Sequence, residues 1–219
     1  MSDTYRTLAA PGTGTYKDRG SKFVAYAFPV ESEEEALGHL ERLRKEHPKA
    51  RHHCFAWRLG TEGRRFRFND DGEPAGTAGR PILGQIDAAG LTNVVVIVVR
   101  YFGGTLLGTS GLIRAYRQSA AEALRQGHFI ERMVLQHWRV ELNYALLPEW
   151  IGAARRAGID ILREEYGTDR VTLLMGVAPG RQENAWLQLK ALLWKSHADD
   201  VRERAWPDGV LCLELLGQR

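Results

Sequence analysis

One stretch, LTNVVVIVVRYFGGTLLGTSGLIRAYRQSAAEALRQG (residues 91–127), constrains the fold more than any other part of this sequence. Residues 91–102 are strongly apolar and predict a strand buried on both faces. Residues 109–127 predict an amphipathic helix that ends at Gly127. Its apolar face consists of Leu112, Tyr116, Ala120, Ala123 and Leu124. A buried strand that turns through glycines into such a helix predicts a domain in which helices pack on a sheet.

Further elements precede this stretch. Residues 21–30 predict a strand, and residues 32–48 predict a helix that begins with a Ser32–Glu35 capping box. Two alternating segments around residues 60–63 predict a β-hairpin, and residues 77–90 predict a second helix. We expect a first domain over residues 1–130 of mixed α and β structure.

The C-terminal part predicts a separate succession of strands and helices. Strands are expected at residues 137–145, on both sides of residues 167–169, and at residues 210–216. Helices are expected at residues 147–158 and 181–196. The resulting β-α-β-β-α-β order is that of a ferredoxin-like sandwich, which we assign to a second domain at residues 136–219. The hinge between the domains is expected near residues 128–136. The fold class is α+β.

Composition narrows the class of protein. The 219 residues carry a net charge of +3, and no segment is apolar enough to cross a bilayer. Residues 1–135 hold 19 basic and 15 acidic residues, a surplus that permits an RNA or anion surface there. The N-terminus lacks a signal-peptide pattern, and Cys54 and Cys212 form no disulfide framework. We therefore expect a cytoplasmic protein with no membrane association.

The glycine-rich loop after the buried strand is a candidate anion site. Gly103 and Gly108 have the spacing of a phosphate-binding loop, but Thr109 and Ser110 stand where such a loop needs lysine. The missing lysine argues against a nucleoside triphosphatase. The loop could instead bind phosphate through its backbone N–H groups, or it could be a structural turn whose glycines allow close packing. The candidate residues are Gly103, Gly104, Gly108, Thr109, Ser110, Arg100 and Arg114.

A second loop, NDDGEPAGTAGRP (residues 69–81), is acidic. Asp70, Asp71 and Glu73 are candidates for binding Mg²⁺ or for acid/base catalysis, although their spacing does not match an EF-hand. Acidic residues before a helix also serve as N-terminal caps. No catalytic residue is assigned beyond these three.

The hairpin begins with RHHCFAWR (residues 51–58), which contains two histidines and a cysteine. Alternation along a strand separates His53 from His52 and Cys54, which argues against a zinc or thiol site, and we assign no metal and no cofactor. Arg58, Arg65 and Arg67 instead suggest a basic hairpin backed by phenylalanines, suited to RNA. The alternative is an ordinary charged sheet edge.

Three segments, RHHCFAW, NDDGEPAGTAGRPIL and VVVRYFGGTLLGTSGLIRAY, together resemble the signature of the IMPACT family, in its bacterial YigZ-like branch. The resemblance covers residues 17–127. It implies a first domain like a small-subunit ribosomal protein and domain four of elongation factor G, and a ferredoxin-like second domain. Eukaryotic members are translational regulators that keep a starvation-sensing kinase from its activator through an extra N-terminal domain. Few residues precede Lys17, so we do not expect the kinase role here, and no catalytic residue is carried over.

Together these features favour a non-enzymatic protein that binds RNA or the ribosome, without DNA specificity, and modulates translation. The alternative is an enzyme or binding protein for a small phosphorylated ligand held between the two glycine-rich loops. A third hypothesis is a protein–protein interaction module. The sequence indicates no particular oligomeric state.

Overall fold

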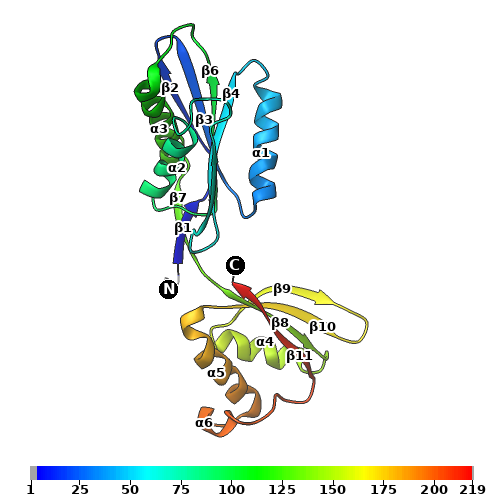
Figure 1. Ribbon diagram of the computed structural model, residues 1–219. Helices are drawn as coiled ribbons and strands as arrows, with labels where there is room; N and C mark the ends of the chain where they lie inside the picture. The colour runs from blue at the N-terminus through cyan, green and yellow to red at the C-terminus, as the bar shows by residue number, and fades with distance from the viewer. Residues whose placement is uncertain (1–3, 219) are drawn as a thin grey trace. The chain divides into compact units, whose positions relative to one another are not determined.

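The computed structural model describes residues 4–218 as a mixed α and β protein with several sheets and helices (Figure 1). The chain divides into two compact units, one at Thr4–Arg132 and the other from Met133 onward. No helix within residues 4–218 has the length and apolar character needed to span a bilayer. The two units are described separately.

A five-stranded antiparallel sheet forms the centre of the first unit, in the order β2-β3-β6-β4-β5. Its strands are β2 (Gly12–Asp18), β3 (Ser21–Pro29), β4 (His52–Leu59), β5 (Arg65–Asn69) and β6 (Val94–Tyr101). The apolar strand β6 lies in the middle, where both of its faces are covered, and Val94–Val99 are fully buried. This confirms the strand predicted from the apolar run.

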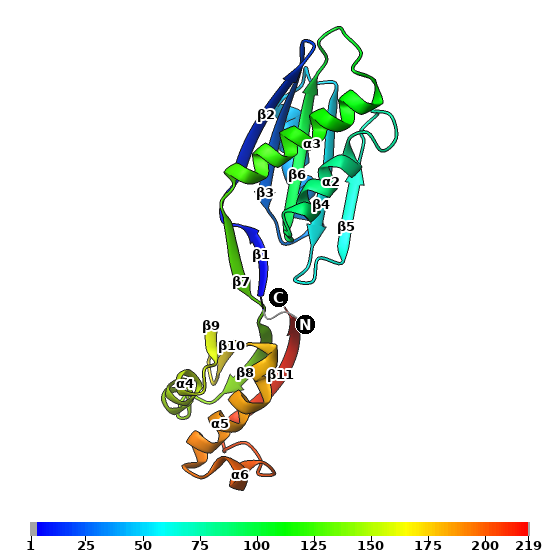
Figure 2. The same ribbon diagram turned by 90° about the vertical axis from the view of Figure 1, so that its left-hand side faces the viewer.

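Helices cover both faces of this sheet, as Figures 1 and 2 show. Helix α1 (Glu33–Glu46) covers one face, and α2 (Gly79–Ala88) and α3 (Gly108–Gln126) cover the other. The predicted apolar face of α3 is buried against the sheet. Ser32 caps α1 by accepting the Glu35 N–H, whereas the Glu35 carboxylate accepts from Glu31 rather than from Ser32.

Strand β2 was not expected, because its sequence GTGTYKD looks like a turn. Its glycines serve packing against α3: a Cβ at Gly12 would lie 2.1 Å from the Ala123 carbonyl oxygen. A Cβ at Gly14 would similarly lie 2.5 Å from the Ala123 backbone nitrogen of α3. The strand therefore touches the helix backbone directly, which weakens its sequence signal.

The segment expected to be a hinge contains a strand. Strand β7 (Phe129–Met133) pairs with β1 (Thr4–Leu8) in a separate two-stranded sheet. Residues 129–133 are therefore hydrogen-bonded to the start of the chain, a long-range pairing that local sequence patterns do not reveal.

The second unit contains a four-stranded antiparallel sheet in the order β11-β8-β10-β9. Its elements are β8 (Gln136–Leu142), α4 (Leu147–Arg156), β9 (Asp160–Tyr166), β10 (Val171–Val177), the 3₁₀ turn η1 (Pro179–Arg181), α5 (Gln182–Trp194), α6 (Ala198–Val201) and β11 (Val210–Gln218). Trp150 of α4 and Leu189 of α5 are fully buried in its core with Val140 and Leu173 of the sheet. The strands and long helices predicted from residue 137 onward are confirmed.

Candidate functional site

The acidic loop, residues 70–78, joins β5 to α2 and begins with a helix cap. The Asp70 carboxylate accepts the backbone N–H groups of Gly76, Ala78 and Gly79 at 2.9, 3.0 and 2.8 Å. These donors lie at and just before the first turn of α2, where backbone N–H groups lack partners within the helix. Asp70 therefore fixes the start of α2.

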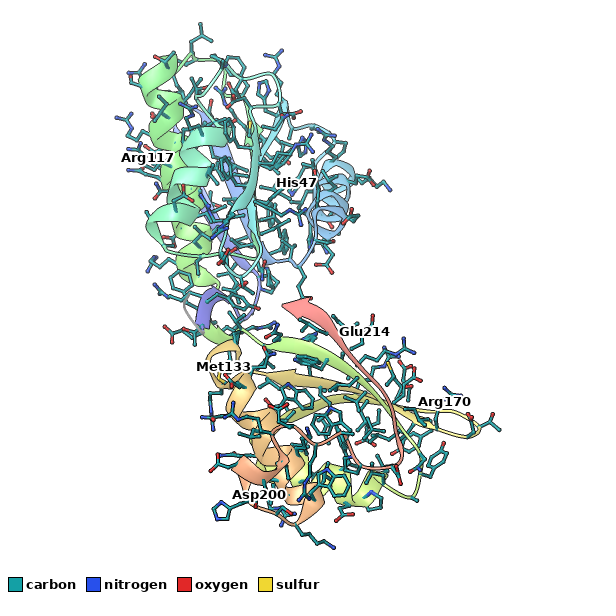
Figure 3. All side chains as sticks on the ribbon, turned by 60° about the horizontal axis from the view of Figure 1, so that its bottom comes forward. His47, Arg117, Met133, Arg170, Asp200 and Glu214 are labelled. Atoms are coloured by element: carbon teal, nitrogen blue, oxygen red, sulfur yellow. The ribbon has the colours of Figure 1, made fainter. Side chains whose placement is uncertain are left out.

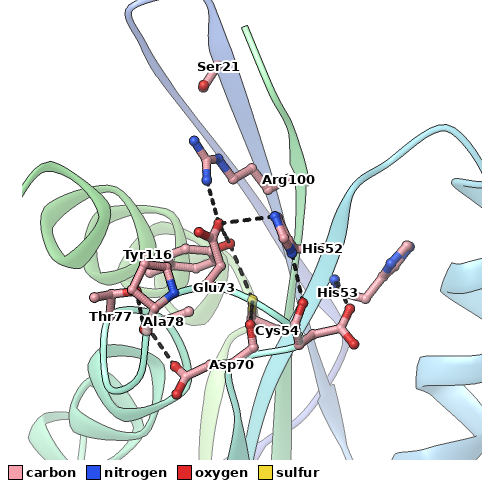
Figure 4. A network of polar contacts seen from close by, with 12 residues as sticks. Ser21, His52, His53, Cys54, Asp70, Glu73, Thr77, Ala78, Arg100 and Tyr116 are labelled. Carbon is pink, nitrogen blue, oxygen red and sulfur yellow. Dashed lines mark hydrogen bonds and ion pairs between the residues drawn. The ribbon is translucent and has the colours of Figure 1, made fainter. Parts of the chain in front are cut away.

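Glu73 lies in a buried network between the sheet and α3 (Figure 4). One of its carboxylate oxygens pairs with the Arg100 guanidinium at 2.6 Å and accepts the Tyr116 hydroxyl proton at 2.7 Å. The same oxygen lies 4.0 Å from Nε2 of His52. The Glu73 and Arg100 side chains are 3% and 6% exposed. Because two charges are desolvated here, losing either one would leave the other unpaired at high cost.

Cys54 completes this network from β4. Its thiol donates to the Asp70 carbonyl oxygen at 3.0 Å and lies 3.3 Å from the Tyr116 hydroxyl oxygen. Burial raises the pKa of the Cys54 thiol and of the Tyr116 hydroxyl well above their ordinary values. Both groups are therefore protonated at neutral pH, and Cys54 lacks the thiolate that a nucleophile requires.

Asp71 connects the acidic loop to the other face of the sheet. Its carboxylate accepts the His53 backbone N–H at 2.7 Å and pairs with Arg44 of α1 at 3.1 Å. Its carbonyl oxygen lies 2.7 Å from Nδ1 of His52, so that nitrogen carries the hydrogen. Alternation along β4 accordingly sends the His52 and His53 side chains in different directions, as predicted.

The three candidate carboxylates thus have three different partners. Asp70 holds backbone N–H groups, Asp71 holds Arg44, and Glu73 holds Arg100 and Tyr116. Within residues 4–218, no group of three or more His, Cys, Asp or Glu side chains is placed to hold a metal ion. These contacts hold the acidic loop to elements on both sides of the sheet.

The open loop, residues 102–107, joins β6 to α3. Gly103 is its fixed point: its N–H donates to the Ser21 hydroxyl at 3.1 Å, and a Cβ there would lie 1.9 Å from the Gly20 carbonyl carbon. Gly104 and Gly108 have positive φ and open space around them. Thr109 and Ser110 occupy the first turn of α3 with exposed side chains.

The two arginines predicted for this loop differ in their positions. Arg100 is directed to Glu73 and stacks on Phe23 and Phe102, so its guanidinium is engaged inside the unit. Arg114 is exposed and pairs with Asp18 at 3.1 Å. The glycine spacing could not show that Arg100 has a buried carboxylate as its partner.

Four further basic residues surround the open loop, and the sequence analysis did not single them out. Lys17 and Lys22 are cross-strand neighbours, Lys22 also lies opposite Tyr101, and Arg19 is in the turn between β2 and β3. Arg51 stacks on Phe102. We call Lys17, Arg19, Lys22 and Arg51 the basic end; all four are exposed and none has an ion-pair partner within residues 4–218. A signal was present in the sequence, since three of them fall within residues 17–22.

The hairpin arginines do not form one face. Register places Arg58 opposite Phe66, and Arg58 pairs with Asp87 of α2 at 2.6 Å. Arg65 and Arg67 project from the other face, where Arg67 pairs with Glu33 of α1. The expected common surface is wrong, because residue 58 and residues 65 and 67 alternate to opposite sides of the sheet.

Comparison with known proteins identifies relatives over most of the chain. Residues 19–124 match the model of the Impact N-terminal domain. "IMPACT family member YigZ" of Escherichia coli (strain K12) is 41% identical over 138 residues, which cover 62% of this chain and 68% of that protein. "IMPACT family member in pol 5'region" of Thermus thermophilus is 41% identical over 192 residues, 86% of this chain and 98% of the relative.

A solved structure agrees with these relatives. The crystal structure of a hypothetical protein matches 99% of this chain and 98% of its own, with 32% identity and a TM-score of 0.70. The similarity thus covers both units, and the residues matched by the family model include the acidic loop, the open loop and the Glu73 network. This chain belongs to the IMPACT family.

Proposed function

We propose that this protein is a cytoplasmic, non-enzymatic modulator of translation that binds structured RNA or the ribosome through the basic end and the open loop. The observation that carries the proposal is the set of four exposed basic side chains around that loop, none of which has an acidic partner among residues 4–218. Free cations next to exposed backbone N–H groups match the chemistry of a phosphate backbone. Phe102 and Leu106, both exposed, add apolar contact area for unpaired bases.

The family fits this function in general terms, as the resemblance to eukaryotic translational regulators implied. We also propose that the first unit has the layered fold of a small-subunit ribosomal protein and that the second is a ferredoxin-like sandwich. Two free cysteines, Cys54 and Cys212, are typical of a reducing compartment.

The test is sedimentation of the full chain with ribosomes and isolated subunits across a salt series. The variant Lys17→Gln/Arg19→Asn/Lys22→Gln removes three positive charges, and asparagine suits the positive φ of Arg19. We expect pelleting that falls with salt, and a variant whose log-affinity slope against log salt is smaller by about 2 to 3, because each phosphate contact contributes about 0.7 to 0.9.

The matched control is Arg58→Gln/Arg65→Gln/Arg67→Gln, which removes the same charge from the hairpin. If the control loses binding as much as the first variant does, the contact surface is not the basic end. Pelleting that does not respond to salt would overturn phosphate recognition altogether.

The alternative of a small phosphorylated ligand held by Asp70, Asp71 or Glu73 gains no specific support, because each carboxylate already has a protein partner.

A further inference from the structure

A groove of about 420 Å³ lies between α2 and α3. Arg80, Gly84 and Gln85 of α2 and Ile113 and Arg117 of α3 line it. Gly76 of the acidic loop lies at its rim. Its volume is in the range of sites for small ligands, which is about 300 to 1,000 Å³.

The charge of this groove is positive and uncompensated. Arg80 stacks on Phe68, with 5.8 Å between the guanidinium carbon and the ring centre, and has no acidic partner within the described residues. Arg117 on α3 (Figure 3) is exposed, and its side chain forms no ion pair or hydrogen bond within residues 4–218. By contrast, Arg58, Arg67 and Arg114 each pair with a carboxylate. No lining residue is acidic, so the groove favours an anion.

The remaining lining suits a base attached to that anion. The half-buried Ile113 provides apolar surface next to Pro81, which is buried but borders the groove, and the Gln85 amide can both donate and accept hydrogen bonds. Gly84 leaves open space, because a Cβ built there meets no atom within 4 Å. An RNA strand, which the proposed function supplies, presents a phosphate and a base together, and this lining suits both.

We propose that the Arg80–Arg117 groove binds one nucleotide unit of single-stranded RNA, with its phosphate between the two guanidinium groups and its base over Pro81 and Ile113. This inference deepens the proposed function and rests on it. The groove would be a second RNA contact, separate from the basic end.

The test is fluorescence anisotropy of a labelled single-stranded ten-nucleotide RNA with the full chain. Gly84→Leu fills the groove without removing a charge and improves helix propensity, so the variant is expected to fold. Gly38→Leu is the matched control, because Gly38 lies in α1 and a Cβ there also meets no atom within 4 Å. We expect Gly84→Leu to weaken RNA binding by about tenfold or more and Gly38→Leu to leave it unchanged.

Arg80→Gln/Arg117→Gln is expected to weaken binding by a similar factor, with Arg125→Gln on α3 as its control. Adenosine monophosphate distinguishes a strand from a free nucleotide. If it competes as well as the RNA does, the site takes a mononucleotide and the proposal is overturned. Equal affinities for Gly84→Leu and Gly38→Leu would overturn it too.

The two proposals fail separately. If the Lys17/Arg19/Lys22 variant loses ribosome pelleting and Gly84→Leu has no effect on RNA binding, only the groove proposal is overturned. If the protein does not pellet with ribosomes but its RNA binding is weakened by Gly84→Leu, the groove proposal stands and ribosome binding is overturned.

Discussion

The acidic loop and the open loop are both rich in glycine, but they differ in how firmly their side chains are held. Both contain glycines, both follow a strand of the same sheet, and both lead into a helix on the same face of it. In the acidic loop, the carboxylates of Asp70 and Glu73 each hold several groups. In the open loop, Gly103 is held by the Ser21 hydroxyl and Leu107 packs on the core, whereas the Leu106 side chain between them is 81% exposed.

The difference shows that glycine content does not define the role of a loop. In the acidic loop, the carboxylates of Asp70 and Glu73 have backbone or buried side-chain partners, so the loop stabilises the unit. In the open loop, glycine leaves backbone and side chains exposed beside uncompensated cations, so the loop can serve recognition. Substitutions at Glu73, Gly103, Gly104 and His53 test this contrast.

The largest effect is expected for Glu73→Ala. This change leaves the Arg100 guanidinium buried without its carboxylate, so we expect a loss of about 3 to 5 kcal/mol in the free energy of unfolding. Chemical denaturation followed by circular dichroism measures it. The double variant Glu73→Ala/Arg100→Met should recover part of the loss, because it removes the unpaired charge. A loss below about 1 kcal/mol would mean that the acidic loop is not fastened as described.

A smaller effect is expected within the open loop. Gly103→Ala forces a Cβ against the backbone of Gly20 and Ser21, so a loss of about 2 to 3 kcal/mol is expected. Gly104→Ala meets no neighbouring atom and bears only the strain of its positive φ, about 1 to 2 kcal/mol. Thermal unfolding of both variants compares them. Equal losses would contradict the close packing of Gly103 against Gly20 and Ser21.

The smallest effect concerns pH. Burial lowers the pKa of His53 below its ordinary value. The Asp71 carboxylate of the acidic loop opposes this shift, and the charges of Arg44 and His47 add to it. As pH falls, the unfolded chain therefore binds a proton first. The contribution of neutral His53 to the free energy of unfolding is present above about pH 6.5. It is lost as pH falls through the pKa that His53 has in the folded protein. Unfolding measured between pH 7.5 and 5 should show a slope of up to about 1.4 kcal/mol per pH unit from this group.

His53→Leu should flatten that slope, while His197→Gln, at an exposed histidine of the second unit, should leave it unchanged. The pKa of His39 is also lowered by burial, so a residual slope in His53→Leu is expected. An unchanged slope in His53→Leu would assign the pH dependence elsewhere.

The sequence by itself determined the elements whose signal is local. The apolar run of β6, the Ser32 cap of α1, the apolar face of α3 and the turn at residues 60–63 each depend on neighbours close in the chain. Segments whose residues serve distant packing were missed. Gly12 and Gly14 look like part of a turn in the sequence. In the structure they allow contact with the α3 backbone, which lies more than a hundred residues away in the sequence.

Only the tertiary structure decided what the charged residues do. Arg100 and Glu73 are 27 residues apart and carry no shared pattern, yet burial makes each the necessary partner of the other. Arg58, Arg65 and Arg67 look alike in sequence, and register separates them to two faces. Ion pairing and burial depend on which segments meet across the sheet, and local periodicity does not contain that information.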